Sequence, residues 1–354
     1  MHTPPMGLYE APLPPDWPAP EALGFGQILG PYLVHAQHGD ESGWSAPTIS
    51  ARATLPLALA SGGLQYGLSA FEGLKAYRDP DGRIHLFRPR DHAHRLAQSA
   101  TRLVMPEPSD ELFMTLCQLA VQVHARYVPP FGRGALYLRP TLYAEEEALG
   151  FRPATRHRLV VAVTPCSDPP AKTVRLWAET EYTRAAPGGL GAAKTGGNYA
   201  AGLAGLQRAK ARGYDDVVWL DAHTHRELGE AGTMNIFVQI GEEVLTPALD
   251  GTILAGITRD SVLRLLRAEG MKISETRISL DELASAQLAG QLGAGFGVGT
   301  AARLVKISEI ADGARQIRFT DTGLAGRVYA ALKQVQEGAT HALREWRSAV
   351  PTPQ

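Results

Sequence analysis

The proline-rich segment TPCSDPPAK, residues 164 to 172, interrupts this chain near its middle. Its three prolines can continue neither a helix nor a central strand, and the residues around them favour turns. The segment therefore predicts a boundary between two domains. With 354 residues, 44% of them hydrophobic, the chain is long enough to bury a core on each side of that boundary.

Before the boundary, two stretches are typical of strands and two of helices. GALYLRPTLYA at 134 to 144 is rich in strand-forming residues, and HRLVVAVT at 157 to 164 is a continuous apolar run that suits a buried strand. Helices are expected over residues 91 to 103 and 110 to 127.

After the boundary, strand and helix patterns alternate. The expected strands are TVRLWA, DDVVWL, TMNIFVQI and AGFGVG; the expected helices cover 198 to 212, 258 to 269, 280 to 289 and a long stretch from about 321. This alternation predicts mixed α/β or α+β layers, and no repeat of 20 to 50 residues indicates a solenoid. We predict an extended proline-rich arm (1–20), a small N-terminal α/β domain (21–165), an interdomain loop (166–172) and a larger C-terminal domain (173–354).

Charge and cysteine content narrow the classes of partner. With 35 basic and 36 acidic residues, the net charge of -1 provides no field that would attract nucleic acid or an anionic membrane. No segment reaches the roughly 18 apolar residues of a membrane span. Cys117 and Cys166 are too few for a disulfide framework or a four-cysteine zinc site. We therefore expect a soluble protein of the reducing cytoplasm that acts on a small molecule.

The stretch GGLGAAKTGGNY, residues 188 to 199, places Lys194 among small residues that let a ligand approach closely. It nearly matches the phosphate-binding loop G-x-x-x-x-G-K-[ST], but Ala193 replaces the second glycine. That loop must also follow a buried strand, whereas the preceding AETEYTRAAP is polar and rich in turn formers. The sequence therefore disfavours a nucleotide hydrolase. The glycines of GAGFGVGT, residues 293 to 300, do not fit a dinucleotide fingerprint in any register either.

Two interpretations of Lys194 remain open from the residues alone. It is either an ordinary surface lysine or an amine that must lose its proton. The chain has 7 lysines against 28 arginines, and arginine cannot deprotonate in a protein, whereas a desolvated lysine can attack a carbonyl. Schiff-base chemistry is the more specific hypothesis.

Several motifs, taken in order along the chain, resemble those of class IV pyridoxal-phosphate aminotransferases, and most closely the branched-chain amino acid aminotransferases. The motifs are LQYGLSAFEGLKAYR at 64 to 78, LFRPRDHAHRL at 86 to 96, ALYLRPTLY at 135 to 143, GGLGAAKTGGNYAAGL at 188 to 203, GEAGTMNIF at 229 to 237, LDGTILAGITRDSV at 249 to 262 and GVGTA at 297 to 301. The resemblance runs from about residue 20 to the C-terminus. It implies a two-domain fold-type IV enzyme with the cofactor, pyridoxal 5'-phosphate, in the cleft between the domains.

The resemblance also implies which residues bind the cofactor: Arg95, Lys194, Tyr199, Glu230, Leu254, Gly256, Ile257, Thr258 and Thr300. Lys194 would form the Schiff base and act as the catalytic proton carrier, Glu230 would keep the pyridine nitrogen protonated, and Tyr199 would bind the phenolic oxygen. Arg95 would reach the phosphate. The form of LAGITRDSVLRLL supports a phosphate site independently, because a glycine turn that opens a helix presents main-chain N–H groups to an anion.

The substrate-binding residues implied by the resemblance are Tyr66, Phe71, Tyr137, Arg139, Thr233, Thr300 and Ala301, with Met234 beside them. Phe71, Tyr66 and Tyr137 would form an aromatic wall, and Arg139 would bind the distal carboxylate of an acidic substrate. Tyr137 and Arg139 stand two apart in an expected strand, so they should face the same side.

The implied activity is ping-pong transamination of L-leucine, L-isoleucine and L-valine with 2-oxoglutarate, a step of branched-chain amino acid biosynthesis. Within the same fold, a D-amino acid aminotransferase or an aminodeoxychorismate lyase would share Lys194 and Glu230, and a cofactor-binding protein without catalysis is the alternative from another class. The resemblance further implies a homodimer in which a partner loop near Leu149 and Gly150 covers the pocket.

Two other features are given no function. The pairs His92 with His94 and His223 with His225 have metal-like spacing, but no carboxylate or cysteine cluster accompanies them in the sequence, so we interpret them as solvated and predict no metal site. The vertebrate members of the family carry a cysteine pair after the GTA turn. Ala302 and Val305 occupy those places here, which excludes a thiol switch there.

Overall fold

The computed structural model describes residues 12–51, 55–168 and 171–351, and these residues divide into two compact units. The first unit holds the described residues up to 168 together with 193–196 and 334–351; the second holds 171–192 and 197–333. A single cut at residues 166 to 172 therefore does not describe the molecule, because a short central segment and the C-terminus return to the first unit. Most of the expected arm, residues 1–11, lies outside the described residues, and residues 12–19 form neither helix nor strand.

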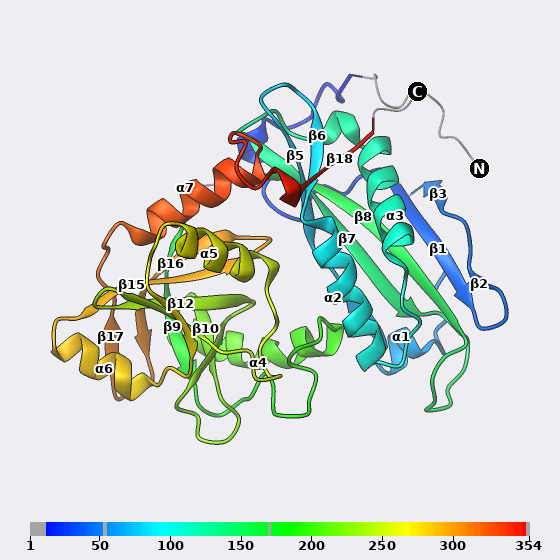
Figure 1. Cartoon of the computed structure of the whole chain (residues 1–354). Coiled ribbons are helices and arrows are strands. Elements are labelled where there is room, and N and C mark those ends of the chain that lie inside the picture. Colours follow the sequence, from blue (N-terminus) through cyan, green and yellow to red (C-terminus); the bar gives the residue numbers. More distant parts are fainter. Residues whose placement is uncertain (1–11, 52–54, 169–170, 352–354) are drawn as a thin grey trace. The chain divides into compact units, whose positions relative to one another are not determined.

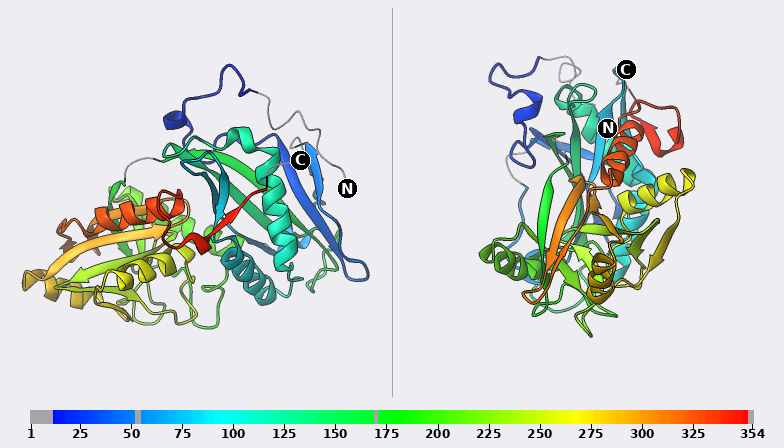
Figure 2. Two further views of the ribbon diagram at one scale, coloured as in Figure 1. Left: turned by 45° about the horizontal axis from the view of Figure 1, so that its top comes forward. Right: turned by 90° about the vertical axis from the view of Figure 1, so that its left-hand side faces the viewer.

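The first unit is built on an antiparallel sheet with the order β18-β6-β5-β7-β8-β1-β2, in which β3 also pairs with β1 and β4 with β7 (Figure 1). Its strands are β1 (Tyr32–Gly39), β2 (Gly43–Trp44), β3 (Thr48–Ala51), β4 (Ser69–Phe71), β5 (Leu74–Arg78), β6 (Ile84–Phe87), β7 (Gly134–Ala144), β8 (Arg156–Ser167) and β18 (Arg347–Ala349). The C-terminal strand β18 lies beside β6 (Figure 1), and Figure 2 gives two further views of the chain. This pairing is why the C-terminus belongs to the first unit.

The long central strands β7 and β8 lie where the sequence predicts them, but β8 continues past the expected end. It extends to Ser167 and includes Pro165, which pairs with Leu136 of β7. The expectation that proline ends the strand is therefore wrong here. The reason is that β8 pairs with β1 only as far as Val161, so Pro165 has one neighbouring strand and its missing N–H interrupts no second ladder.

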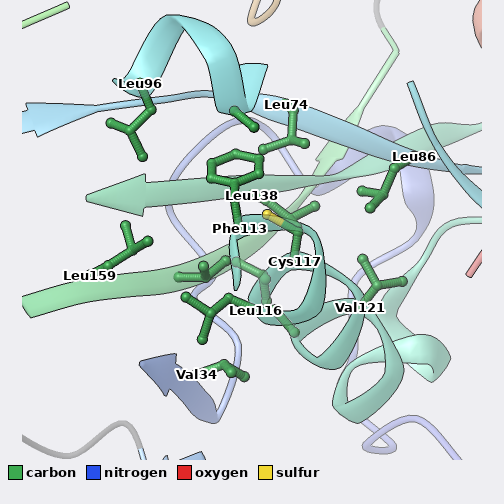
Figure 3. Close-up of a cluster of buried hydrophobic side chains, with 14 of the residues drawn as sticks. Val34, Leu74, Leu86, Leu96, Phe113, Leu116, Cys117, Val121, Leu138 and Leu159 are labelled. Carbon is green, nitrogen blue, oxygen red and sulfur yellow. The ribbon is translucent and has the colours of Figure 1, made fainter. Parts of the chain in front are cut away.

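Helices α2 (Pro89–Arg102) and α3 (Asp110–Val123) cover one face of this sheet (Figure 1). Pro89 opens α2, and Ser109 caps α3 by accepting a hydrogen bond from the main-chain N–H of Leu112. Figure 3 shows the core between helices and sheet, where Phe113 and Leu116 of α3 meet Leu138 and Leu159. The short helices of this unit are α1 (Gly62–Gln65), η2 (Pro20–Ala22), η3 (Ala125–Tyr127) and η4 (Arg344–Trp346).

The second unit contains a mixed sheet with the order β11-β10-β9-β16-β15-β12-β13-β14, and β17 pairs with β16. Its strands are β9 (Thr173–Glu179), β10 (Asp216–Leu220), β11 (Leu228–Ala231), β12 (Met234–Ile240), β13 (Glu243–Pro247), β14 (Ile273–Thr276), β15 (Leu292–Gly299), β16 (Arg303–Ala311) and β17 (Gln316–Arg318). Since β11 also pairs with β12, the strands from β11 round to β12 close into a ring. This closure brings the turn after β11 next to the end of β15.

Both faces of the second sheet are buried. In β12, Ile236 and Val238 belong to one core cluster, while Phe237 points into another and stacks on Phe296 with centroids 5.2 Å apart. The helices are α4 (Gly196–Ala211), α5 (Ile257–Ala268), α6 (Leu280–Leu288) and α7 (Leu324–Gln336), the last of which enters the first unit at residue 334. No helix among the described residues combines the length and the apolar character needed to cross a membrane.

Candidate active site

The main chain of Lys194 is fixed within the first unit on both sides. Its carbonyl oxygen accepts a hydrogen bond of 3.0 Å from the N–H of Phe71, and its N–H donates to the hydroxyl of Ser99 at 2.9 Å. The next residue, Thr195, forms a bridge with Ala70 of β4. Segment 193–196 therefore acts as a short extension of the first sheet, also tied to α2 by Ser99. The side chain of Lys194 extends from this anchored backbone.

That side chain lies against an aromatic ring. The Nζ of Lys194 is 4.9 Å from the ring centroid of Phe71, and the guanidinium carbon of Arg139 is 4.7 Å from the same centroid. Arg139 also donates a hydrogen bond of 2.9 Å to the hydroxyl of Tyr137. Tyr137 and Arg139 thus face the same side of β7, as their spacing predicts, and Phe71 connects them with Lys194.

Arg95 occupies a buried charged cluster in this unit. Its Nε and Nη2 donate to the two carboxylate oxygens of Glu72 at 2.7 and 2.8 Å, and Nδ1 of His92 lies 2.7 Å from the same carboxylate. Burial alone would raise the pKa of Glu72, but the charge of Arg95 and then of His92 outweighs it and holds that pKa well below its ordinary value. The result is an arginine whose fork is held in one orientation by a fully buried acid.

His92 corrects one expectation. It is buried and belongs to the Glu72 cluster, so the interpretation as a solvated residue is wrong for it. The i, i+3 spacing that brings His92 and Arg95 to the same face of α2 was visible in the sequence, but not the acid they would meet. His94 does lie largely exposed, 2.9 Å from Asp110. Among the described residues, no group of three or more histidines, cysteines and acids is placed to hold a metal.

Tyr66 contacts the loop that holds Leu149 and Phe151. It follows α1 and is partly exposed, its hydroxyl donates to the main-chain oxygen of Leu149, and its ring packs edge-on against Phe151 with centroids 5.7 Å apart. Phe151 is 91% exposed and Leu149 64%. The loop to which the resemblance assigns a covering role thus carries exposed apolar side chains.

In the second unit, three of the quoted motifs meet around Leu254. The N–H of Leu254 donates to Oε1 of Glu230 at 2.9 Å, and its carbonyl accepts from the side-chain amide of Asn235 at 2.9 Å. Asn235 is the register partner of Glu230 on β11 and of Val298 on β15. Strand pairing therefore brings GEAGTMN, LAGIT and GVGTA together, although some 60 residues separate the first from the last.

Helix α5 begins at Ile257, and its N-cap is Gly256, with no side-chain cap. A Cβ on Gly256 would stand 1.9 Å from Oδ1 of Asn235, so only glycine fits this close approach. Thr258 is buried in the first turn. A helix N-terminus whose cap has no side chain offers its main-chain donors and its dipole to an anion such as a phosphate.

The remaining nominated residues of the second unit lie on helix α4 and on two turns. Tyr199 is 38% exposed in α4, and Thr233 is exposed in the turn between β11 and β12, where Met234 is buried. Thr300 and Ala301 form the turn from β15 to β16 and are half-buried and exposed. Since β15 pairs with β12, these two turns lie at neighbouring strand ends.

Sequence reasoning missed Glu72, Ser99, Asn235 and Arg184. Glu72 and Asn235 stand inside the quoted motifs FEG and EAGTMN, but nothing local indicates what a glutamate or an asparagine will contact. Arg184 lies in the segment treated only as polar and turn-rich. Its Nε is 3.2 Å from Oε2 of Glu230. Its spacing from Glu230 in the chain gives no signal of this ion pair.

Comparison with known proteins shows which family the chain matches. Residues 69–304 match the model of amino-transferase class IV. The chain is 38% identical to branched-chain-amino-acid transaminase 1 of Bacillus subtilis over 93% of this chain and 94% of the relative, and 39% identical to the branched-chain-amino-acid aminotransferase of Mycobacterium tuberculosis over 89% and 88%.

Solved structures share the fold. The branched-chain aminotransferase of Thermoproteus uzoniensis with norvaline superimposes with a TM-score of 0.75 at 24% identity over 90% of this chain and 100% of that one. The branched-chain amino acid aminotransferase of Escherichia coli gives 0.74 at 23% over 89% and 99%. From the family match and the identity to curated relatives, this chain belongs to amino-transferase class IV, among the branched-chain-amino-acid aminotransferases.

Proposed function

We propose that this protein transfers the amino group of L-leucine, L-isoleucine and L-valine to 2-oxoglutarate with pyridoxal phosphate as cofactor. The observation that carries the proposal is the near full-length identity to relatives named for this activity. Structural neighbours include branched-chain amino acid aminotransferases complexed with N-(5'-phosphopyridoxyl)-L-glutamate and with pyridoxamine 5'-phosphate, which favours the same cofactor here. A D-amino acid aminotransferase or a lyase is less well supported, since the relatives described above carry the branched-chain name.

The residues present fit this cofactor. Gly256 provides a helix N-terminus without a side-chain cap for the phosphate, and a Cβ there would collide with Asn235. Glu230 provides a buried carboxylate for a ring cation, and Lys194 a lysine amine for an aldehyde. When bound, pyridoxal phosphate supplies an aldehyde that takes up an amine and a ring that withdraws electrons from the substrate α-carbon.

The chain's own residues would then have distinct roles. Lys194 Nζ would remove the proton from the α-carbon of the amino acid in one half-reaction and deliver a proton to the α-carbon in the other. Glu230 would hold a proton on the ring nitrogen, and Tyr199 would orient the phenolic oxygen. The phosphate would be held by main-chain donors of Gly256, Ile257 and Thr258. Arg95, Leu254 and Thr300 would complete the cofactor set.

For the substrate, Phe71 and Tyr137 provide an apolar surface, and Arg139 a cation that is exposed and already oriented by Tyr137. We propose that aliphatic side chains lie on the rings and that the distal carboxylate of glutamate pairs with Arg139. We propose that the same substrate is contacted by three loop residues, Tyr66, Thr233 and Ala301.

The test compares the purified protein with two lysine variants. With L-leucine and 2-oxoglutarate, the parent should produce L-glutamate and bind pyridoxal phosphate with a visible absorption band, whereas D-alanine should not react. Lys194→Ala should abolish both turnover and the band. Lys306→Ala, which removes a half-buried lysine paired with Asp321, is the matched control and should keep both. Turnover of leucine by Lys194→Ala at the parent rate would refute the assignment.

We further propose that the protein acts as a homodimer in the cytoplasm. The apolar residues Leu59, Leu149 and Phe151 of the first unit are exposed, which supports a surface that a second copy of the chain covers. Cys117 and Cys166 are free and buried, as suits a reducing compartment. Light scattering should give twice the mass of 38.0 kDa. A Phe151→Glu variant should shift that mass toward one chain, and a monomeric parent would contradict the dimer.

A further inference from the structure

Arg184 lies between β9 and α4 and forms an ion pair with Oε2 of Glu230. The Nε of Arg184 is 3.2 Å from Oε2, and the two side chains are 12% and 6% exposed. The other carboxylate oxygen accepts from the N–H of Leu254. The carboxylate is therefore oriented by partners on both of its oxygens. A carboxylate offers about four acceptor positions in all.

The guanidinium is itself held by the main chain. Its Nη2 donates to the carbonyl of Thr252 at 2.5 Å and to that of Gly191 at 3.3 Å. A planar fork with partners on two loops and on Glu230 is a rigid arrangement that a lysine could not copy. Thr252 stands two residues before Leu254. Arg184 therefore fixes both Glu230 and the loop that leads to the N-terminus of α5.

The Arg184–Glu230 pair lies among other charged side chains. Arg184 and Glu230 line a cavity of about 40 Å³ whose other ionisable side chains are Asp221, Glu227, Asp250 and Arg277. Three of those four are acidic, and like charges favour the protonated form of a carboxylic acid. Arg277 pairs with Glu227 at 3.5 Å, so Arg184 is the cation of this cavity that contacts Glu230. Low solvent exposure and neighbouring acids both disfavour a charged carboxylate, and a cation beside it opposes both effects.

We propose that Arg184 is a positioning residue that keeps Glu230 ionised and thereby keeps the proton on the ring nitrogen of bound pyridoxal phosphate. The inference rests on the proposed function. A proton shared between Glu230 and the ring can reside on either partner. A cation closer to the carboxylate than to the ring stabilises the arrangement with the carboxylate charged and the ring protonated. The protonated ring is the better electron acceptor, so Arg184 supports catalysis through Glu230 without touching the reacting atoms.

The experiment is nitrogen-15 NMR of the holoenzyme reconstituted with ring-labelled pyridoxal phosphate. In the parent, the ring nitrogen should resonate as a protonated pyridinium. In Arg184→Gln, the signal should move toward that of the unprotonated ring and kcat for L-leucine should fall by about tenfold or more with the cofactor still bound. Arg184→Lys keeps the charge but loses the fork, and should restore most of the protonated signal.

Two further variants separate this role from a structural one. Arg259→Gln removes a buried arginine that also donates to a main-chain carbonyl and pairs with a glutamate, Glu275, and should leave the ring signal at the parent position. If Arg184→Gln does not fold, Arg184→Met, which keeps the buried stem, gives the same comparison. A parent-like signal in the Gln or Met variant overturns this inference but leaves the proposed function standing. A parent that binds no cofactor overturns the proposed function instead.

Discussion

Lys194 and Phe71 are in direct contact: the amine nitrogen lies 4.9 Å from the ring centroid, and the main-chain N–H of Phe71 donates to the carbonyl of Lys194. One residue thus holds both the backbone and the side chain of the lysine. The same ring carries Arg139 at 4.7 Å. Phe71 is the element through which the amine and the proposed carboxylate receptor are placed relative to each other.

Replacing Phe71 by Leu should therefore slow reaction with both substrates. The variant keeps the backbone hydrogen bond but loses two cation–π contacts, each about 0.5–1 kcal/mol at an exposed site and about 2 when desolvated. We expect kcat/KM to fall by about tenfold or more for L-leucine and for L-glutamate alike, measured in the two half-reactions. Phe71→Tyr retains the ring and should stay close to the parent. A loss confined to glutamate would show that only Arg139 depends on the ring.

Replacing Glu72 by Gln should destabilise the protein strongly. Arg95 would remain buried with no counter-charge, and breaking a buried pair by removing one partner costs about 3–5 kcal/mol. Urea unfolding of the parent, Glu72→Gln and the double variant Glu72→Gln/Arg95→Met measures this cost. The double variant should be more stable than the single one, because it buries no unpaired cation. If it is less stable, the cost lies in packing and not in charge.

Replacing Gly256 by Ala should weaken cofactor binding without straining the backbone. Gly256 has a φ of -68°, which any residue adopts, but the new methyl would displace Asn235 and break its hydrogen bond to Leu254. Overpacking of this kind costs about 1–3 kcal/mol, which corresponds to roughly five- to 150-fold in cofactor affinity.

The matched control is Gly326→Ala in α7, where a Cβ would meet no atom within 4 Å. It should leave affinity unchanged and stabilise the fold by about 0.4–1 kcal/mol. Equal cofactor affinity of the Gly256 and Gly326 variants, measured by equilibrium dialysis, would argue against a phosphate site at Gly256.

His124 should make stability depend on pH. Its Nε2 accepts from the N–H of Tyr32 at 3.2 Å and its Nδ1 lies 2.7 Å from the carbonyl of Ala120, a pair of contacts that suits the neutral ring. Burial lowers the pKa of His124 from 6.5 to about 4, and the nearby Arg126 adds to this while the Ala120 bond opposes it. As pH falls from 6.5 to about 4, the unfolded chain therefore gains a proton that the folded chain does not.

The free energy of unfolding should accordingly drop over that window, by on the order of 3 kcal/mol from this group, and be unaffected by it above pH 6.5. His124→Gln should flatten this part of the profile, since an amide oxygen can still accept from Tyr32 but does not titrate. His341→Gln, at an exposed position, serves as the control. Identical slopes for the parent and His124→Gln would contradict the prediction.

Much of the fold was predictable because its signals are local. The apolar runs of β7 and β8 and the capped start of α3 lie close to where sequence patterns place them. The continuation of β8 through Pro165 was not predicted, and neither was the return of residues 193–196 and 334–351 to the first unit. Both depend on which strands lie alongside, namely where β1 ends against β8 and where β18 pairs with β6.

For the candidate site, the sequence determined the chemical groups and the tertiary structure decided their partners. The glycines around Lys194, the Gly256 turn into a helix and the two-residue spacing of Tyr137 and Arg139 could be found within short windows, because they express backbone geometry. The contacts of Glu72 with Arg95 and of Glu230 with Arg184 join residues 23 and 46 positions apart. Such pairs arise only when strands and loops close on one another, since a charge has no preferred partner until burial removes the water that would otherwise solvate it.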